Sequence, residues 1–152
     1  MIEPRVRSGA RVLLFDRLVD MEPQSKKEVR PLTTLDKQGL KTSIRRELGR
    51  LLNTRCPIPL APQEERTVIN YGIPDFSSLS PNSSDHRTLL ESWVRNAIEA
   101  FEPRLLDVRV IVEPPARAEL TLVVRIDARL QLETIREPVA FSVVMKRDTP
   151  RK

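Results

Sequence analysis

The spacing of the apolar residues changes abruptly at Pro103, and this change restricts the fold more than any other feature of the chain. Upstream, apolar residues recur every three or four positions, as on one face of a helix. Downstream, they alternate with polar residues, as in a strand with one buried face. Proline ends a helical pattern because the residue before it is disfavoured in the helical conformation. The sequence therefore predicts an α+β fold, with helices first and a sheet after them.

Two stretches upstream of Pro103 have helical spacing. The first is predicted to begin at a Thr33 or Thr34 cap, with Asp36 in its first turn, and to end near Asn53. Its apolar face consists of Leu40, Ile44, Leu48 and Leu51 or Leu52. Gly39 and Gly49 lie inside this helix and weaken it by about 1 kcal/mol each relative to alanine. Tertiary packing must therefore hold it.

The second helix is predicted to begin at Ser83 or Ser84, with Asp85 in its first turn, and to end at Pro103. Its buried stripe is predicted to comprise Leu89 or Leu90, Trp93, Ala97 and Phe101, widened by Val94 and Ile98. Between the two helices, residues 56–65 are rich in proline and residues 66–76 suggest a short extended piece that closes at Gly72 and Pro74.

Three alternating segments follow Pro103. Their predicted core faces are Leu106, Val108, Val110 and Val112; Leu120, Leu122, Val124, Ile126, Ala128 and Leu130; and Val139, Phe141, Val143 and Met145. Arg125, Asp127 and Arg129 lie on the opposite face of the middle segment. Such a pattern indicates an antiparallel sheet with one face in water. We expect two main helices packed on one face of this small sheet.

Three regions follow from these patterns. Residues 1–33 are predicted to be an arm with a short amphipathic helix and a linker, residues 34–147 the α+β domain, and residues 148–152 a basic tail. Leu14, Phe15 and Leu18 belong to the apolar part of the arm. A helix this short is marginal in water and must dock, either on its own domain or on a partner.

Composition excludes several classes of protein. The net charge is +5, but the 26 Lys and Arg residues are dispersed and aromatics make up only 4%, so nucleic-acid binding is not favoured. No apolar run approaches the length of a membrane span and no signal segment opens the chain, so we expect a cytoplasmic protein without direct membrane insertion. The single Cys56 excludes an internal disulfide and fits a reducing compartment.

The sequence also gives little support for catalysis. His86 is the one histidine, and the four glycines are isolated from one another, so we expect no metal site, no phosphate loop and no cofactor. A cell-wall glycosidase remains the alternative, since it needs only Glu102 and a second carboxylate such as Glu99 or Asp107. However, Arg104 beside Glu102 would lower the pKa of that carboxylate, which is the wrong direction for a general acid. We expect a protein that is not an enzyme.

Glu102, Pro103 and Arg104, which we call the hinge, stand where the second helix gives way to the first strand. In one interpretation, Pro103 stops the helix and the two charges form a local ion pair. In the other, the rigid proline directs both charges towards a neighbouring chain, because guanidinium and carboxylate groups dock well on backbone and charged groups. The residues alone do not choose between the two.

Three longer motifs carry a resemblance to a known family. They are "SIRRELGRLLNTR" (43–55), "VINYGIPDFSS" (68–78) and "LLESWVRNAIEAFEPRLLDVRV" (89–110), and their order and spacing match over about residues 35–147. Together they resemble the TssE subunit of the type VI secretion system baseplate, which is similar to phage baseplate wedge proteins grouped as lysozyme-like. "LLFDRL" near the start of the chain resembles the N-terminal element of that family.

This resemblance implies a structural role in a cytoplasmic baseplate wedge at the inner membrane. The implied partners are the baseplate proteins TssF, TssG and TssK and the sheath proteins TssB and TssC. Glu102, Pro103 and Arg104 would form the wedge contact. The open edge of the sheet would exchange strands with the sheath and so nucleate its first ring, which suits an edge strand with unpaired main-chain groups.

Overall fold

The computed structural model describes residues 10–11, 34–35, 37–57, 67–114, 121–132 and 135–147. The chain divides into two compact units, Met1–Ile44 and Arg45–Lys152. In the first unit, β1 (Ala10–Arg11) pairs antiparallel with β2 (Thr34–Leu35). The predictions for Leu14, Phe15 and Leu18, and for the tail 148–152, lie outside the described residues.

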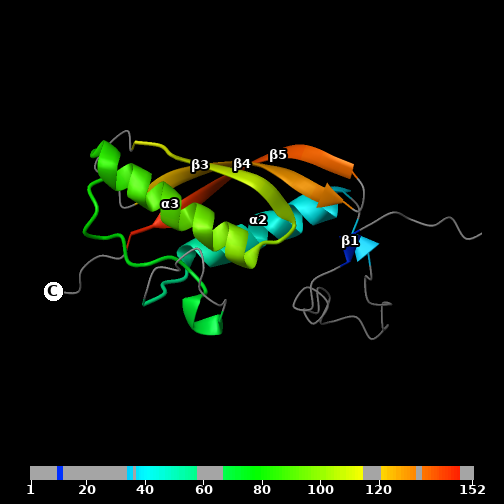
Figure 1. The fold of residues 1–152 in the computed structure, drawn as a ribbon, viewed down its shortest axis with the longest axis horizontal. Helices are drawn as coiled ribbons and strands as arrows, with labels where there is room; N and C mark the ends of the chain where they lie inside the picture. The colour runs from blue at the N-terminus through cyan, green and yellow to red at the C-terminus, as the bar shows by residue number, and fades with distance from the viewer. Residues whose placement is uncertain are drawn as a thin grey trace, which may run out of the picture. The chain divides into compact units, whose positions relative to one another are not determined.

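The second unit contains a three-stranded antiparallel sheet in the order β3-β4-β5 (Figure 1). β3 is Leu105–Val112, β4 is Thr121–Leu132 and β5 is Ile135–Lys146. Side chains on one face are buried, namely Leu122, Val124, Ile126, Ala128 and Leu130 of β4 with Val139, Phe141, Val143 and Met145 of β5. The opposite face carries exposed arginines. The predicted one-sided sheet and the α+β class are confirmed.

The helix α2 (Lys37–Asn53) spans the boundary between the two units. Its buried apolar residues are those predicted, namely Leu40, Ile44, Leu48, Leu51 and Leu52, and Ser43 is buried beside them. Its predicted start is wrong, because Thr34 lies in β2 and the first helical turn contains no acidic residue. Thr34 and Leu35 form a strand that pairs with β1, so the helix begins only after them.

The helix α3 (Ser84–Phe101) packs on β3 and begins after Ser83, as predicted, with Asp85 in the first turn (Figure 1). Within the described helix the Ser83 side chain makes no capping hydrogen bond. Its buried residues are Leu90, Val94, Ala97, Ile98 and Ala100. Trp93 and Phe101, predicted to be in the core stripe, are only half-buried. The buried face is therefore centred on Val94 and Ile98, about one position from the predicted stripe.

β3 contains a bulge that corrects a second prediction. In its register with β4, Leu106 lies opposite Arg129 and Arg109 opposite Asp127, so Asp107 and Val108 together face the single residue between them. Asp107 has φ 53°, in the left-handed region that few non-glycine residues adopt. The extra residue shifts the alternation, and Leu105 rather than Leu106 is buried with Val108. Alternation in the sequence cannot reveal such an insertion.

Candidate functional site

The hinge turns the chain from α3 into β3. Glu102 is the C-cap of α3, with φ −125° and ψ 73°, and its N–H donates to the carbonyl of Ile98 at 2.8 Å. The N–H of Leu105 then donates to the carbonyl of Glu102 at 3.1 Å, which closes a turn around Pro103. Because proline cannot continue the helix, β3 starts only four residues after the last helical one. The hinge thus has a fixed backbone.

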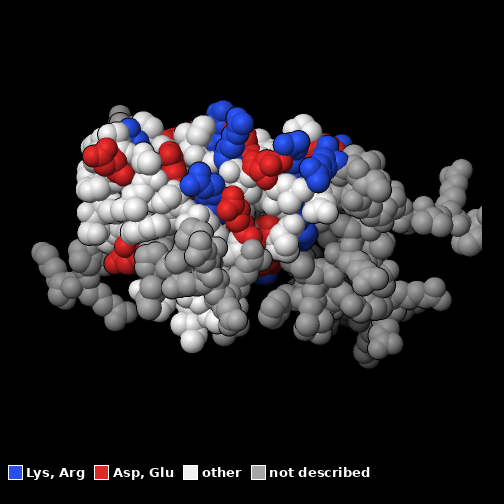
Figure 2. Space-filling view, viewed as in Figure 1, with Lys and Arg blue, Asp and Glu red and all other residues white. Residues whose placement is uncertain are grey.

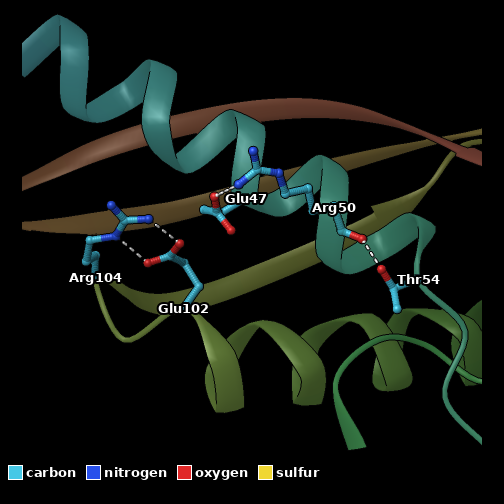
Figure 3. A network of polar contacts seen from close by, with 5 residues as sticks. All are labelled: Glu47, Arg50, Thr54, Glu102 and Arg104. Atoms are coloured by element: carbon cyan, nitrogen blue, oxygen red, sulfur yellow. Dashed lines mark hydrogen bonds and ion pairs between the residues drawn. The ribbon is translucent and has the colours of Figure 1, made fainter. Parts of the chain in front are cut away.

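The two hinge charges bind each other. Arg104 Nε donates to Glu102 Oε1 at 2.5 Å, and Arg104 Nη2 donates to Glu102 Oε2 at 2.6 Å, so both carboxylate oxygens are engaged (Figure 3). The side chain of Glu102 is 5% exposed and that of Arg104 is 15% exposed. The local ion pair considered from the sequence therefore forms. It is a two-bond, charge-assisted pair in a mostly buried position, not a loose surface contact.

This burial limits what the hinge can offer to another chain. Glu102 has its carboxylate turned to Arg104 and is almost closed to solvent, whereas Pro103 is exposed. Figure 3 shows the third guanidinium nitrogen of Arg104 pointing away from Glu102. The hinge therefore does not hold two outstretched charges in the solvent. The docking role predicted for these three residues remains a prediction. Within the hinge, Glu102 holds the Arg104 side chain in place through its two hydrogen bonds.

Residues from the other two motifs surround the hinge. The Tyr71 and Phe101 rings meet edge to face, with centroids 5.3 Å apart. On α2, Arg50 Nη1 donates to Glu47 Oε1 at 2.5 Å, beside the hinge pair (Figure 3). Burial, followed by the negative charge of Glu47, raises the pKa of Tyr71 above its ordinary value of 10.0. The three motifs, separate in the sequence, converge here.

Gly72 fixes the loop that carries Tyr71. Its φ is 121°, and a Cβ atom there would lie 2.5 Å from the carbonyl oxygen of Thr54. The N–H of Ile73 donates to that same oxygen at 2.9 Å, and the Cys56 N–H donates to Ile73 O at 3.1 Å. Only glycine permits this close approach. The extended piece predicted here is instead a 3-10 turn, η1 (Val68–Asn70), followed by an isolated parallel bridge between Ile73 and Arg55, two residues after the end of α2.

The outer edge of β5 is partly closed by the chain itself. Asn53 Nδ2 donates to the carbonyl of Val144, and the N–H of Lys146 donates to Asn53 Oδ1, both at 3.0 Å. Arg55 also donates to the carbonyl of Lys146. Arg147 then donates to the carbonyls of Ser77 and Leu79 at 2.7 and 2.9 Å. The prediction of an open sheet edge therefore does not apply to the last residues of β5. Asn53 belongs to the first of the three motifs, but no local pattern predicted its contact with β5.

The geometry gives no support to general acid catalysis by Glu102, because both of its oxygens accept bonds from Arg104. His86 accepts the Ser80 N–H through Nδ1 at 2.9 Å and so holds the turn before α3. Among the residues that the structure describes, no group of three or more potential ligand side chains could hold a metal ion. The described helices also include none that could span a membrane.

The part of the chain that matches a known family contains all three motifs. A family described as baseplate wedge protein gp25 matches residues 38–134, which is more than half of the chain. No curated protein matches the sequence.

Two solved structures are similar. A chain in the baseplate complex from the type VI secretion system has a TM-score of 0.52 and 15% identity, covering 72% of this chain and 96% of that one. A protein described as a tail lysozyme from Geobacter sulfurreducens has a TM-score of 0.47 and 21% identity, covering 77% and 99%. At 15% identity, the similarity to the chain of the type VI secretion baseplate complex shows a shared fold and nothing more.

Proposed function

The chain belongs to the baseplate wedge protein gp25 family, and from this premise we propose that it is a structural subunit of a type VI secretion baseplate wedge that anchors the contractile sheath. The family match over residues 38–134 carries the proposal, because it spans α2, the Tyr71 loop, the hinge and β4. The similarity in fold to a chain of the type VI secretion baseplate complex supports the assignment to this secretion system.

Further details of the assembly are part of the proposal. TssF, TssG and TssK are the wedge partners, TssB and TssC are the sheath partners, and assembly occurs at the cytoplasmic face of the inner membrane. The arm residues Leu14, Phe15 and Leu18 grip one of these partners. The motif resemblance described above supports these assignments.

The hinge is the proposed wedge contact. Its backbone places the exposed Pro103 next to Arg104, whose third guanidinium nitrogen points away from Glu102 (Figure 3). Arg50 of α2, whose side chain is 46% exposed, lies in the same polar cluster and widens this surface. A pre-organised surface of this kind loses little conformational entropy on binding, which favours assembly.

A test of the hinge must separate folding from binding. Arg104→Ala would leave the buried carboxylate of Glu102 without its partner, and breaking a buried pair costs about 3 kcal/mol or more. Replacing both residues by methionine removes the buried charges together and is expected to change stability by only about 1 kcal/mol. The informative variant is therefore Glu102→Met with Arg104→Met. Arg95→Ala, an exposed arginine of α3, serves as the control.

We expect the wild-type protein and the Arg95→Ala control to co-purify with TssF and TssG, and the folded double variant to lose them. Circular dichroism and denaturant unfolding verify that the double variant is folded. Normal co-purification of the double variant would remove the hinge from the interface. If the wild-type protein captures neither TssF nor TssG, the assignment to the wedge is itself wrong.

The glycosidase alternative makes a different prediction. Turnover of peptidoglycan by the purified protein, lost in Glu102→Gln, would favour it over the structural role. The mutual engagement of Glu102 and Arg104 argues against this outcome, because the carboxylate is held in an ion pair rather than facing a substrate.

A further inference from the structure

The last residues of β5 lie at a corner of the sheet that is supported by few strands. Residues 121–122 of β4 pair with residues 145–146 of β5, whereas β3 is paired with β4 only as far as Val124. Among the described residues, this corner therefore consists of two strands. Two strands alone are only marginally stable in water, and the end of a chain segment frays unless other contacts hold it.

The side chains at this corner nevertheless belong to the core. Met145 is 0% exposed and Leu122 is 3% exposed. Opening of the corner would bring both side chains into water, which is unfavourable because both are apolar. A corner that is weakly paired and fully buried needs a further restraint.

Three polar side chains supply this restraint, and we call them the clasp, namely Asn53, Arg55 and Arg147. Asn53 is the last residue of α2 and makes two hydrogen bonds to the end of β5, with the carbonyl of Val144 and the N–H of Lys146. Its Nδ2 also donates to the carbonyl of Gly49 at 2.9 Å, which holds the side chain on its own helix. The end of β5 is thereby joined to α2.

Arg55 joins the same strand end to a buried aromatic ring. It donates to the carbonyl of Lys146, and its guanidinium carbon lies 4.6 Å from the centre of the Phe76 ring. Phe76 is 1% exposed, so the guanidinium stacks on a fixed part of the core. The bridge between Arg55 and Ile73 holds the main chain of Arg55 as well.

Arg147 follows β5 directly and binds the turn after Phe76. It donates to the carbonyls of Ser77 and Leu79, at 2.7 and 2.9 Å. In the same turn, hydrogen bonds from Ser77 lower the pKa of Asp75, and the positive charges of Arg55 and Arg147 lower it further. Both arginines of the clasp therefore lie near this carboxylate, which favours their positions electrostatically.

We propose that the clasp prevents β5 from peeling away from β4 when the contracting sheath pulls on this subunit. The proposal rests on the proposed function, because the load comes from the sheath that this chain anchors. A strand that is pulled from its end separates from its neighbour one hydrogen bond at a time, starting at that end. The clasp adds five hydrogen bonds where peeling from the C-terminal end of β5 would begin.

Hydrogen exchange of the full chain tests whether the clasp keeps the corner closed. Val144 and Lys146 turn their bonded groups to Asn53, so Met145 between them faces β4 and keeps its ladder partner when the clasp is removed. In the double variant Asn53→Ala with Arg147→Ala, the Met145 amide should exchange at least tenfold faster than in the wild type. Each lost hydrogen bond contributes roughly fivefold to the opening equilibrium.

The matched control is the double variant Thr42→Ala with Arg125→Ala. Thr42 makes its hydrogen bond within α2, and Arg125 is an exposed residue of β4 on the outer face of the sheet. This control should leave exchange at Met145 within about twofold of the wild type. If the clasp variant lost as much protection at Ile98, in the core of α3, as at Met145, the clasp would only add to global stability, and the proposal would be wrong.

Force measurements on single molecules, held by the two ends of the chain, test the mechanical part of the proposal. The lifetime of the folded state at constant force depends on the unfolding rate rather than on the equilibrium stability. We expect this lifetime to be at least tenfold shorter in the clasp variant, and within about twofold of the wild type in the control. A clasp variant that stays folded as long as the wild type would overturn the proposal.

Capture of the sheath proteins TssB and TssC by the wild-type chain separates this inference from the proposed function. The exchange and force measurements use no partner, so their results do not depend on capture. Failure of capture would overturn sheath anchoring and the mechanical role of the clasp together. Normal capture with a failed exchange or force test would overturn the clasp alone.

Discussion

At the scale of single residues, burial decides what the hinge does. An exposed ion pair between residues two positions apart contributes under about 1 kcal/mol. Glu102, 4% exposed and bonded through both oxygens, is in a different situation, since loss of Arg104 would leave a buried charge uncompensated. The sequence places the two charges beside each other. It does not reveal their burial, which depends on where α3, β3 and the loop of Tyr71 meet.

Tyr71 gives the hinge cluster a measurable pH dependence. Its pKa is raised above 10.0, first by burial and then by Glu47, so the folded state keeps the phenol protonated. In the unfolded chain the phenol ionises near its ordinary value. Its contribution to stability is therefore complete below pH 10.0 and is lost as the pH rises through the folded pKa.

Tyr71→Phe keeps the ring against Phe101 and removes this ionisation. We expect the free energy of unfolding of the variant, relative to wild type, to increase as the pH rises from 8 through about 10 and above. Urea denaturation of both proteins across this range measures the difference. A constant difference at all these pH values would mean that Tyr71 is as solvated in the folded state as in the unfolded one.

At the scale of elements, the sequence predicts a helix or strand best where the spacing of its apolar residues depends on that element alone. The period of apolar residues places α2, α3 and the core faces of β4 and β5 correctly. It fails where a second element intervenes. Pairing with β1 shortens the start of α2, and an extra residue in β3 exchanges Leu106 for Leu105 in the core. Likewise, the local sequence around Asn53 indicates only the end of a helix. Its hydrogen bonds to β5 join residues more than ninety positions apart in the sequence, so local patterns do not predict them.

Two glycines in neighbouring elements should respond in opposite ways to the same substitution. Gly49 lies inside α2 with nothing within 4 Å of a Cβ atom, whereas Gly72 combines φ 121° with a Cβ position 2.5 Å from Thr54 O. We expect Gly49→Ala to stabilise the protein by about 0.5–1 kcal/mol. Gly72→Ala should destabilise it by about 2 kcal/mol or more, since strain and a backbone clash act together.

Denaturant unfolding of the two variants measures both effects, and each serves as the control for the other. If Gly72→Ala were neutral, the loop would be able to move away from Thr54, and the convergence of Tyr71 on the hinge would be less rigid than the contacts indicate. A destabilising Gly49→Ala would mean that the helix surface at that position is covered by another part of the chain.

At the scale of the whole molecule, the arrangement of charge matters more than its sum. The net charge is +5, from 26 basic and 21 acidic residues. On the outer face of the sheet, Arg129 Nη2 lies 2.6 Å from Asp107 Oδ2, and Arg125 Nε lies 3.6 Å from Asp127 Oδ2. Basic and acidic side chains are likewise interleaved on the face shown in Figure 2. Such mixing keeps a surface solvated without producing a field of one sign.

This arrangement predicts weak binding to nucleic acid despite the high isoelectric point. A protein that neutralises several phosphates at once needs a continuous basic surface, and its affinity then falls steeply with salt. Here neighbouring carboxylates compete for the same arginines, so we expect a Kd for a short DNA duplex above about 10 µM at 0.15 M salt, with a shallow salt dependence. Fluorescence anisotropy at several salt concentrations measures both quantities. Tight binding with a steep slope would require a basic surface outside the described residues, and nucleic acid would then compete with the wedge as the partner of this protein.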